Sequence, residues 1–182
     1  RDILSADAFH NAMTTDMAMG GSSNSVLHLL AIAHEAGQTI DLTTLNTYSD
    51  RTPHLCKLAP ASNQHMEDLH HAGGLGAVMS ELLGIGLLQG TAMTVTGETV
   101  AANLAPGSRW APDPALRNRD VVRSPQEPYS MTGGLAILFG NLAPEGAVVK
   151  RAAVAESMMQ HTGPARVYDS EEDATRAIMA HE

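Results

Sequence analysis

The sequence is poor in cysteine and aromatic residues, and both shortages restrict what the protein can be. Its single cysteine, Cys56, excludes an internal disulfide and any cysteine-rich metal site built from these 182 residues alone. Aromatic residues make up 3% of the chain, so the core must rely on Leu, Ala, Val, Ile and the ten methionines. One unpaired cysteine fits a reducing compartment, and we expect a cytoplasmic location.

Positive charge and long apolar runs are also scarce. The chain has 11 basic against 20 acidic residues, a net charge of −9 and no basic run, which argues against nucleic acid and anionic membrane surfaces as partners. The apolar run that begins at Val26 is interrupted by His28 and ends at His34, well short of a membrane span. We therefore expect small molecules or proteins as partners.

The most informative feature that is present is the segment from Asp16 to Gly37, DMAMGGSSNSVLHLLAIAHEAG. Here Gly20 and Gly21 precede four small polar residues and then the apolar run, a pattern typical of a capped helix start. The free N–H groups of such a start can hold a carboxylate or phosphate. The candidate anion- or substrate-binding residues are Gly21, Ser22, Ser23 and Asn24. The alternative is a capped core helix that binds nothing.

Hydrophobic spacing divides the chain into a helical part and a β-rich part. Helices are predicted at residues 5–17, 24–36, 63–71, 75–83, 98–104 and 171–182, with another short helix after Asp41. Strands are predicted at residues 93–96, 135–139, 147–153 and 165–168. The helix at 24–36 is apolar on most sides and is expected to be central. Ser170 and Asp173 form a capping box before the last helix.

Three other groups of residues could carry chemistry, and each has a structural alternative. Glu67 and His70 have the Glu-x-x-His spacing of carboxylate-bridged metal sites and lie near His65, but no second copy of the motif exists. Helix-dipole stabilisation explains the same residues. Cys56, beside Lys57, could be an activated nucleophile, although its apolar flanks favour a packed thiol. His28 is more readily explained as a hydrogen-bonded ring than as a catalytic base.

Four segments resemble the dihydroxy-acid and sugar-acid dehydratase family. They are DMAMGGSSNSVLHLLAIAHEAG, the stretch from Thr52 to Gly74, TGGLAILFGNLAPEGAVVK from Thr132 to Lys150, and HTGPARVYDSEEDA from His161 to Ala174. The strings LCKLAP and HMEDLHHAGG look more like dihydroxy-acid dehydratase than like phosphogluconate dehydratase.

The resemblance implies an α/β fold. Residues 1–104 would form the mostly helical end of a large α/β domain, 105–132 a proline-rich linker, and 133–182 the beginning of a β-rich, β-barrel-like swivelling domain. It implies a hydro-lyase that converts 2,3-dihydroxy carboxylic acids to 2-keto acids in branched-chain amino acid biosynthesis. It also implies a homo-oligomer, a dimer when intact, with an iron–sulfur cluster and Mg²⁺.

The family's cluster cysteines, magnesium ligands and catalytic serine have no counterpart in this sequence. We therefore assign no catalytic and no metal-binding residue to it. We expect the 182 residues to be the central piece of a longer enzyme, inactive alone, with apolar surface exposed. The alternatives are a piece of a sugar-acid or phosphogluconate dehydratase, or a non-catalytic anion-binding module.

Overall fold

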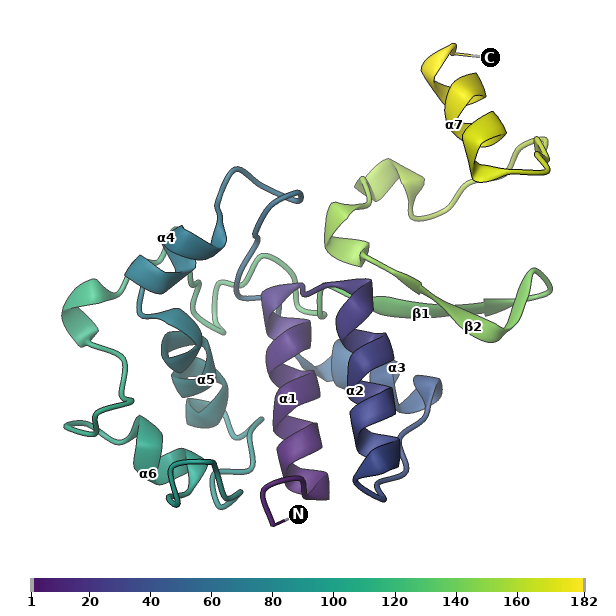
Figure 1. Ribbon diagram of the computed structural model, residues 1–182. Helices are drawn as coiled ribbons and strands as arrows, with labels where there is room; N and C mark the ends of the chain where they lie inside the picture. The colour runs from purple at the N-terminus through teal and green to yellow at the C-terminus, as the bar shows by residue number, and fades with distance from the viewer. Residues whose placement is uncertain (1, 182) are drawn as a thin grey trace.

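The computed structural model describes residues 2–181 as a helical body followed by a β-hairpin and a separate C-terminal helix (Figure 1). The helices are α1 Ala6–Met19, α2 Ser23–Glu35, α3 Leu42–Arg51, α4 Met66–His71, α5 Gly74–Gly84, α6 Val100–Leu104 and α7 Glu171–Met179. The strands are β1 Ala136–Gly140 and β2 Ala143–Val149, and short 3-10 turns occupy Pro114–Leu116, Arg151–Ala153 and Glu156–Met158.

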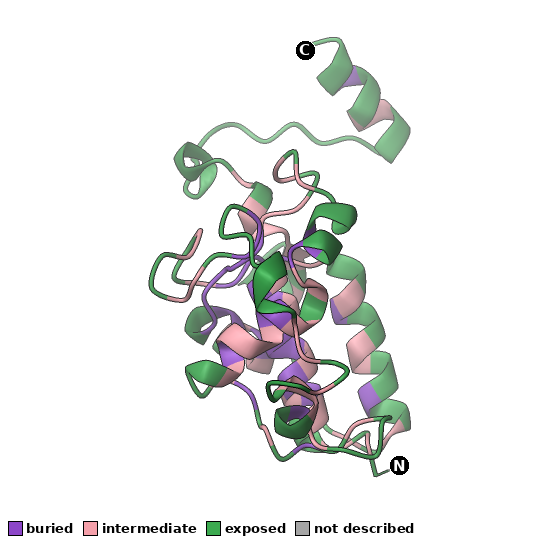
Figure 2. Cartoon of the chain, turned by 90° about the vertical axis from the view of Figure 1, so that its left-hand side faces the viewer, coloured by how far each residue is buried: buried purple, intermediate pink, exposed green. Residues whose placement is uncertain are grey.

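Helix α1 lies in the middle of the helical body because it supplies apolar side chains to both of its flanks. Its N-cap, Ser5, accepts a hydrogen bond from the Ala8 N–H (3.2 Å). On one flank Met13 and Met17 join a cluster with α2, α3 and the start of β1. On the other flank Ala18 contacts a second cluster built around α4 and α5. Figure 2 shows the buried residues gathered in the interior of the helical body, whereas the C-terminal helix is mostly exposed.

The two strands form an antiparallel hairpin that joins the helical body through α3. Ile137 pairs with Val148, and a register shift falls between Leu138 and Gly140. The Asn46 side chain on α3 makes two hydrogen bonds to the backbone of β1. Its Nδ2 donates to the Ile137 carbonyl (2.9 Å), and its Oδ1 accepts from the Ile137 N–H (2.8 Å). This two-point contact fixes β1 against α3, and β2 in turn lies along α2.

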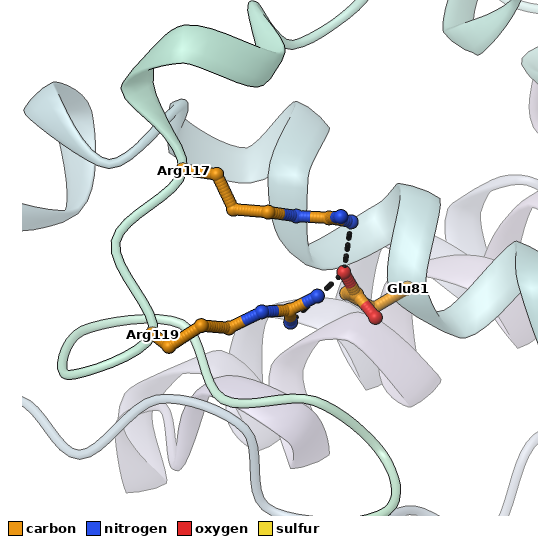
Figure 3. A network of polar contacts seen from close by, with 3 residues as sticks. All are labelled: Glu81, Arg117 and Arg119. Atoms are coloured by element: carbon orange, nitrogen blue, oxygen red, sulfur yellow. Dashed lines mark hydrogen bonds and ion pairs between the residues drawn. The ribbon is translucent and has the colours of Figure 1, made fainter.

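The proline-rich segment 105–132 is fixed to the helical body by polar contacts. Figure 3 shows Glu81 of α5 between Arg117 and Arg119, with its Oε1 bonded to Arg117 and 3.0 Å from Nη1 of Arg119. At the end of the segment, the His54 N–H donates to the Ser130 carbonyl and the Tyr129 N–H donates to the His54 carbonyl, each at 2.9 Å. The segment therefore follows the surface of the body closely.

Helix α7 stands apart from the rest of the molecule (Figure 1). Ser170 caps it, with its Oγ accepting from the Asp173 N–H at 3.1 Å, which is one half of the predicted capping box, while the Asp173 carboxylate pairs with Arg176. Only Ala177 is buried, whereas Ile178 is 70% exposed. The helix is held by its own local contacts much more than by tertiary packing.

The structure confirms the mixed helix-and-strand fold and most predicted helices, but it corrects several expectations. The stretch 93–96 makes only an isolated bridge, from Met93 to Thr99, around a turn. Residues 165–168 form no strand and are exposed. Helix α2 is peripheral, because within it only Val26 and Ala33 are buried.

The second strand also begins earlier than predicted and ends at Val149, after which the chain turns into a 3-10 helix. The β-barrel-like character of the C-terminal part and the division into domains stay predictions. No helix within residues 2–181 has both the length and the apolar character required to cross a membrane.

Candidate functional site

The predicted helix start is present at the junction of α1 and α2. Gly20 ends α1 with left-handed backbone angles (φ 60°, ψ 47°), which glycine adopts without strain. Ser22 is the N-cap of α2, and its Oγ accepts from the Asn24 N–H at 3.2 Å. Ser23 and Asn24 are exposed. The glycine-and-serine motif thus forms a capped helix start that faces solvent.

Asp16 lies directly beneath this helix start. A Cβ placed on Gly21 would lie 1.9 Å from Asp16 Oδ1, so a larger residue at this position would have to push the Asp16 carboxylate aside. The Ser25 hydroxyl donates to Asp16 Oδ2 at 2.7 Å. Burial raises the pKa of Asp16, while the Ser25 hydrogen bond and the nearby Lys150 lower it. A carboxyl group therefore already lies near the first turn of α2.

A second glycine pair, Gly133 and Gly134, packs against the first. A Cβ on Gly134 would lie 2.3 Å from the Gly20 Cα, and one on Gly133 would lie 2.8 Å from the Met17 Cβ. The Gly134 N–H donates to the Met17 carbonyl (3.0 Å). The backbone at the end of α1 and the backbone just before β1 are thus in direct contact, with no side chain between them.

His54 completes the polar residues at this junction. Its side chain is 3% exposed, and its Nε2 has no hydrogen-bond partner within residues 2–181. Burial lowers the pKa of His54 to about 4, and Lys57 and Lys150 add to the effect. The ring is therefore neutral at physiological pH.

A large pocket of about 710 Å³ opens beside Asp16, between α1, α2, α5 and the turn around Met93. Leu29, Met79 and Val95 give it an apolar wall. Asp16, Ser25 and His28 provide polar groups in its lining. Such a pocket suits a small aliphatic molecule with polar groups at one end.

The sequence pattern thus indicated the helix start and His28, which lines the adjacent pocket, but not the pocket residues Asp16 and Ser25. None of the four candidates Gly21, Ser22, Ser23 and Asn24 lines it, whereas Asp16 and Ser25 do. One signal for Asp16 was available: a carboxylate in the last turn of a helix is disfavoured by the dipole. The anion-binding role of the four candidates stays a prediction.

The alternative metal site is explained by capping contacts. His65 is the N-cap of α4, and its N–H donates to Asp68 Oδ2 at 2.7 Å. His70 and His71 lie in the last turn of that helix, where the dipole favours them. Within residues 2–181, no three His, Cys, Asp or Glu side chains come together in a way that could hold a metal ion.

Cys56 is a packed thiol, as its apolar flanks indicated. It is fully buried in the cluster around α4 and α5, and burial raises its pKa to about 12. A thiol of this kind is neither a ready nucleophile nor a ready metal ligand, since both roles require the thiolate.

Comparison with known proteins decides the family. The family model for the dihydroxy-acid/6-phosphogluconate dehydratase N-terminal region matches residues 1–103, and the C-terminal model matches residues 120–182. The chain belongs to this dehydratase family. The two glycine pairs of the junction fall in different matched regions, so the junction is where the N-terminal and C-terminal dehydratase regions meet.

Several curated dehydratases are similar over nearly the whole chain. A protein named dihydroxy-acid dehydratase from Moorella thermoacetica is 56% identical over 178 residues, which cover 98% of this chain and 31% of the relative. One of the same name from Caldanaerobacter subterraneus subsp. tengcongensis is 57% identical over 176 residues, 97% of this chain and 30% of the relative. The chain therefore spans about 31% of the length of these dehydratases.

Proposed function

We propose that this chain is the central part of a dihydroxy-acid dehydratase, a cytoplasmic hydro-lyase of branched-chain amino acid biosynthesis. The observation that carries the proposal is the 50–57% identity, across 97–98% of the chain, to relatives that bear this name. The reaction removes a proton from C2 and hydroxide from C3 of a 2,3-dihydroxy acid. The resulting enol then relaxes to a 2-keto acid.

The junction pocket supports a binding role for this part of the enzyme. Its wall of Leu29, Met79 and Val95 suits a short branched aliphatic tail. Asp16, held by Ser25, can accept a hydrogen bond from a substrate hydroxyl within this pocket. The start of α2 lies outside the pocket lining and is a separate candidate for holding a carboxylate. These residues would bind and orient a dihydroxy acid, and none of them is assigned a bond-breaking step.

The iron–sulfur cluster of the family does not fit the residues described here, and no group of three His, Cys, Asp or Glu side chains within residues 2–181 is arranged to hold Mg²⁺. Cys56 is the one cysteine, and its buried thiol with a pKa of about 12 is unsuited to cluster ligation. We therefore propose that other parts of the intact dehydratase, a homodimer, hold both groups, and we derive no step through them.

A segment exchange tests the proposal. The 182 residues replace the matching segment of the Moorella thermoacetica relative, and 2-keto acid release from dihydroxyisovalerate is measured. We expect turnover by the chimera and none by the isolated chain. A folded chimera without activity would contradict the proposal, as would enzyme-like turnover by the isolated chain.

The same assay separates the alternatives. If the chimera prefers 6-phosphogluconate or another sugar acid as substrate, the chain would be part of a sugar-acid dehydratase and not of a dihydroxy-acid dehydratase. For the non-catalytic alternative, the isolated chain is titrated with sugar acids and phosphate, with Asn24→Ala as the comparison. Saturable binding lost in Asn24→Ala, together with an inactive chimera, would favour the anion-binding module.

A further inference from the structure

A basic cluster lies on the other side of the junction, around His54. Both lysines of the sequence belong to it, since Lys57 and Lys150 are the charges that act on the His54 ring. Arg151 lies next to Lys150 at the end of β2, and the Arg123 guanidinium lies 4.0 Å from the centre of the Tyr129 ring. In a chain with net charge −9, four cations at one place are a local exception.

Within residues 2–181 none of these cations makes a close ion pair, although the charge of Lys150 acts on Asp16 at longer range. The ion pairs within residues 2–181 involve Glu81 and Asp173 as the acids and none of the four cations. Lys57 and Arg151 are nevertheless half-buried. Partial burial of an unpaired charge costs free energy unless an opposite charge neutralises it, so a bound anion would stabilise this cluster.

A small pocket of about 160 Å³ opens within the cluster. Its lining combines two cations, three hydroxyl groups and the buried His54 ring, and contains no acidic side chain. The polar lining side chains are Lys57, Arg151, Tyr129, Ser130, Thr132 and His54. The buried His54 ring also lines this pocket, where it lies against the backbone of Gly20 and Gly134.

We propose that this pocket binds an oxyanion, the carboxylate or phosphate group of a small molecule, held by Lys57 and Arg151. Arg151 offers a planar fork of donors that matches either group, and Lys57 adds a second positive charge. Ser130 and Thr132 supply hydroxyl donors at the rim. The site shares no lining residue with the large apolar pocket beside Asp16.

Calorimetric titration of the isolated chain tests the proposal. Inorganic phosphate and 2-ketoisovalerate serve as the two probes at low ionic strength. We expect saturable binding of at least one probe in a 1:1 ratio, with phosphate identifying a phosphate ester and 2-ketoisovalerate a carboxylic acid as the natural class. Arg151→Gln and Lys57→Gln should each weaken binding about tenfold, because each removes a charge-assisted contact.

Arg166→Gln is the matched control, because it removes the same charge from an exposed residue outside the pocket. It should bind like the parent chain, and circular dichroism establishes that all variants are folded. Absence of saturable binding by both probes would overturn the proposal. Equal weakening in Arg166→Gln and Arg151→Gln would overturn it too, because the effect would then come from net charge.

Discussion

Asp16 has an unusual position for a carboxylate, in the last turn of α1 where the helix dipole disfavours negative charge. The Ser25 hydroxyl and the charge of Lys150 offset this cost, yet burial still raises the pKa of Asp16. One partner is Ser25 on α2, nine residues away in the sequence. The other is Lys150, just after β2 and more than a hundred residues away. Sequence spacing could not reveal these partners.

His54 makes folding stability depend on pH. Its pKa falls from 6.5 to about 4 on folding, so between these values the unfolded chain binds a proton that the folded chain does not. This contribution to stability is complete above pH 6.5 and declines as the pH falls toward 4. The loss should reach about 3 kcal/mol, measured by urea unfolding at a series of pH values.

The variant His54→Gln should lose this part of the pH dependence, whereas His161→Gln, at an exposed position, should keep it. An unchanged slope in His54→Gln would show that other groups cause the pH dependence.

Cys56 should be unreactive in the folded protein. Its thiol is fully buried with a pKa of about 12, so the thiolate is scarce at neutral pH and reagents cannot reach it. We expect a thiol-reactive dye to label Cys56 only when urea unfolds the chain. Rapid labelling in native buffer at the rate of a free thiol would contradict the packed-thiol interpretation.

Gly134→Ala should destabilise the junction strongly. The new methyl would lie 2.3 Å from the Gly20 Cα, and neither backbone can move away without breaking the Gly134–Met17 hydrogen bond. We expect a loss of about 3 kcal/mol in unfolding free energy, at the upper end of overpacking costs. Urea unfolding measures it.

Gly84→Ala is the control for this substitution, because no atom lies within 4 Å of a Cβ at that site in α5. It should be neutral or slightly stabilising, since alanine is the better helix former. Equal losses in the two variants would dispose of the steric explanation.

At the scale of elements, local sequence signals located most helices well. Ser5, Asp41 and Ser170 each accept the expected backbone hydrogen bond at a helix start. Such contacts involve residues only a few positions apart, so the sequence contains all the information needed. The expected strands at 93–96 and 165–168 failed because a strand requires a partner, and local pattern does not supply one.

The caps of α1 and α7 should differ in their effect on stability. Ser5→Ala should lower the unfolding free energy by about 1 kcal/mol, because α1 connects both apolar clusters. Ser170→Ala should leave global unfolding unchanged and speed hydrogen exchange in α7, because that helix has little tertiary packing. Urea unfolding and hydrogen exchange measure the two effects. Equal losses of global stability in both variants would mean that α7 is part of the cooperative core.

At the scale of the whole molecule, the outer surface of α2 exposes two large apolar side chains among polar ones. Leu27 is 66% exposed and Ile32 is 47% exposed, while Asn24, His28 and Glu35 are exposed on the same helix. Exposed apolar surface of this kind favours association. We expect light scattering to show concentration-dependent self-association of the isolated chain.

The double variant Leu27→Gln/Ile32→Gln should shift the chain toward the monomer without loss of stability, since both side chains are exposed. Leu142→Gln/Val167→Gln changes two other exposed residues and serves as the control. A chain that stays monomeric at high concentration, or a control that reduces association equally, would show that the α2 face is not responsible.

The sequence by itself determined the helix starts, the packed cysteine and the family resemblance, because these depend on residues close together in the chain or on motif identity. Only the tertiary structure decided that Asp16 lies under Gly21, that two distant glycine pairs meet, and that His54 joins the basic pocket. It also decided that α2 is peripheral, because hydrophobicity shows which residues can be buried, whereas burial depends on the neighbours that actually cover them.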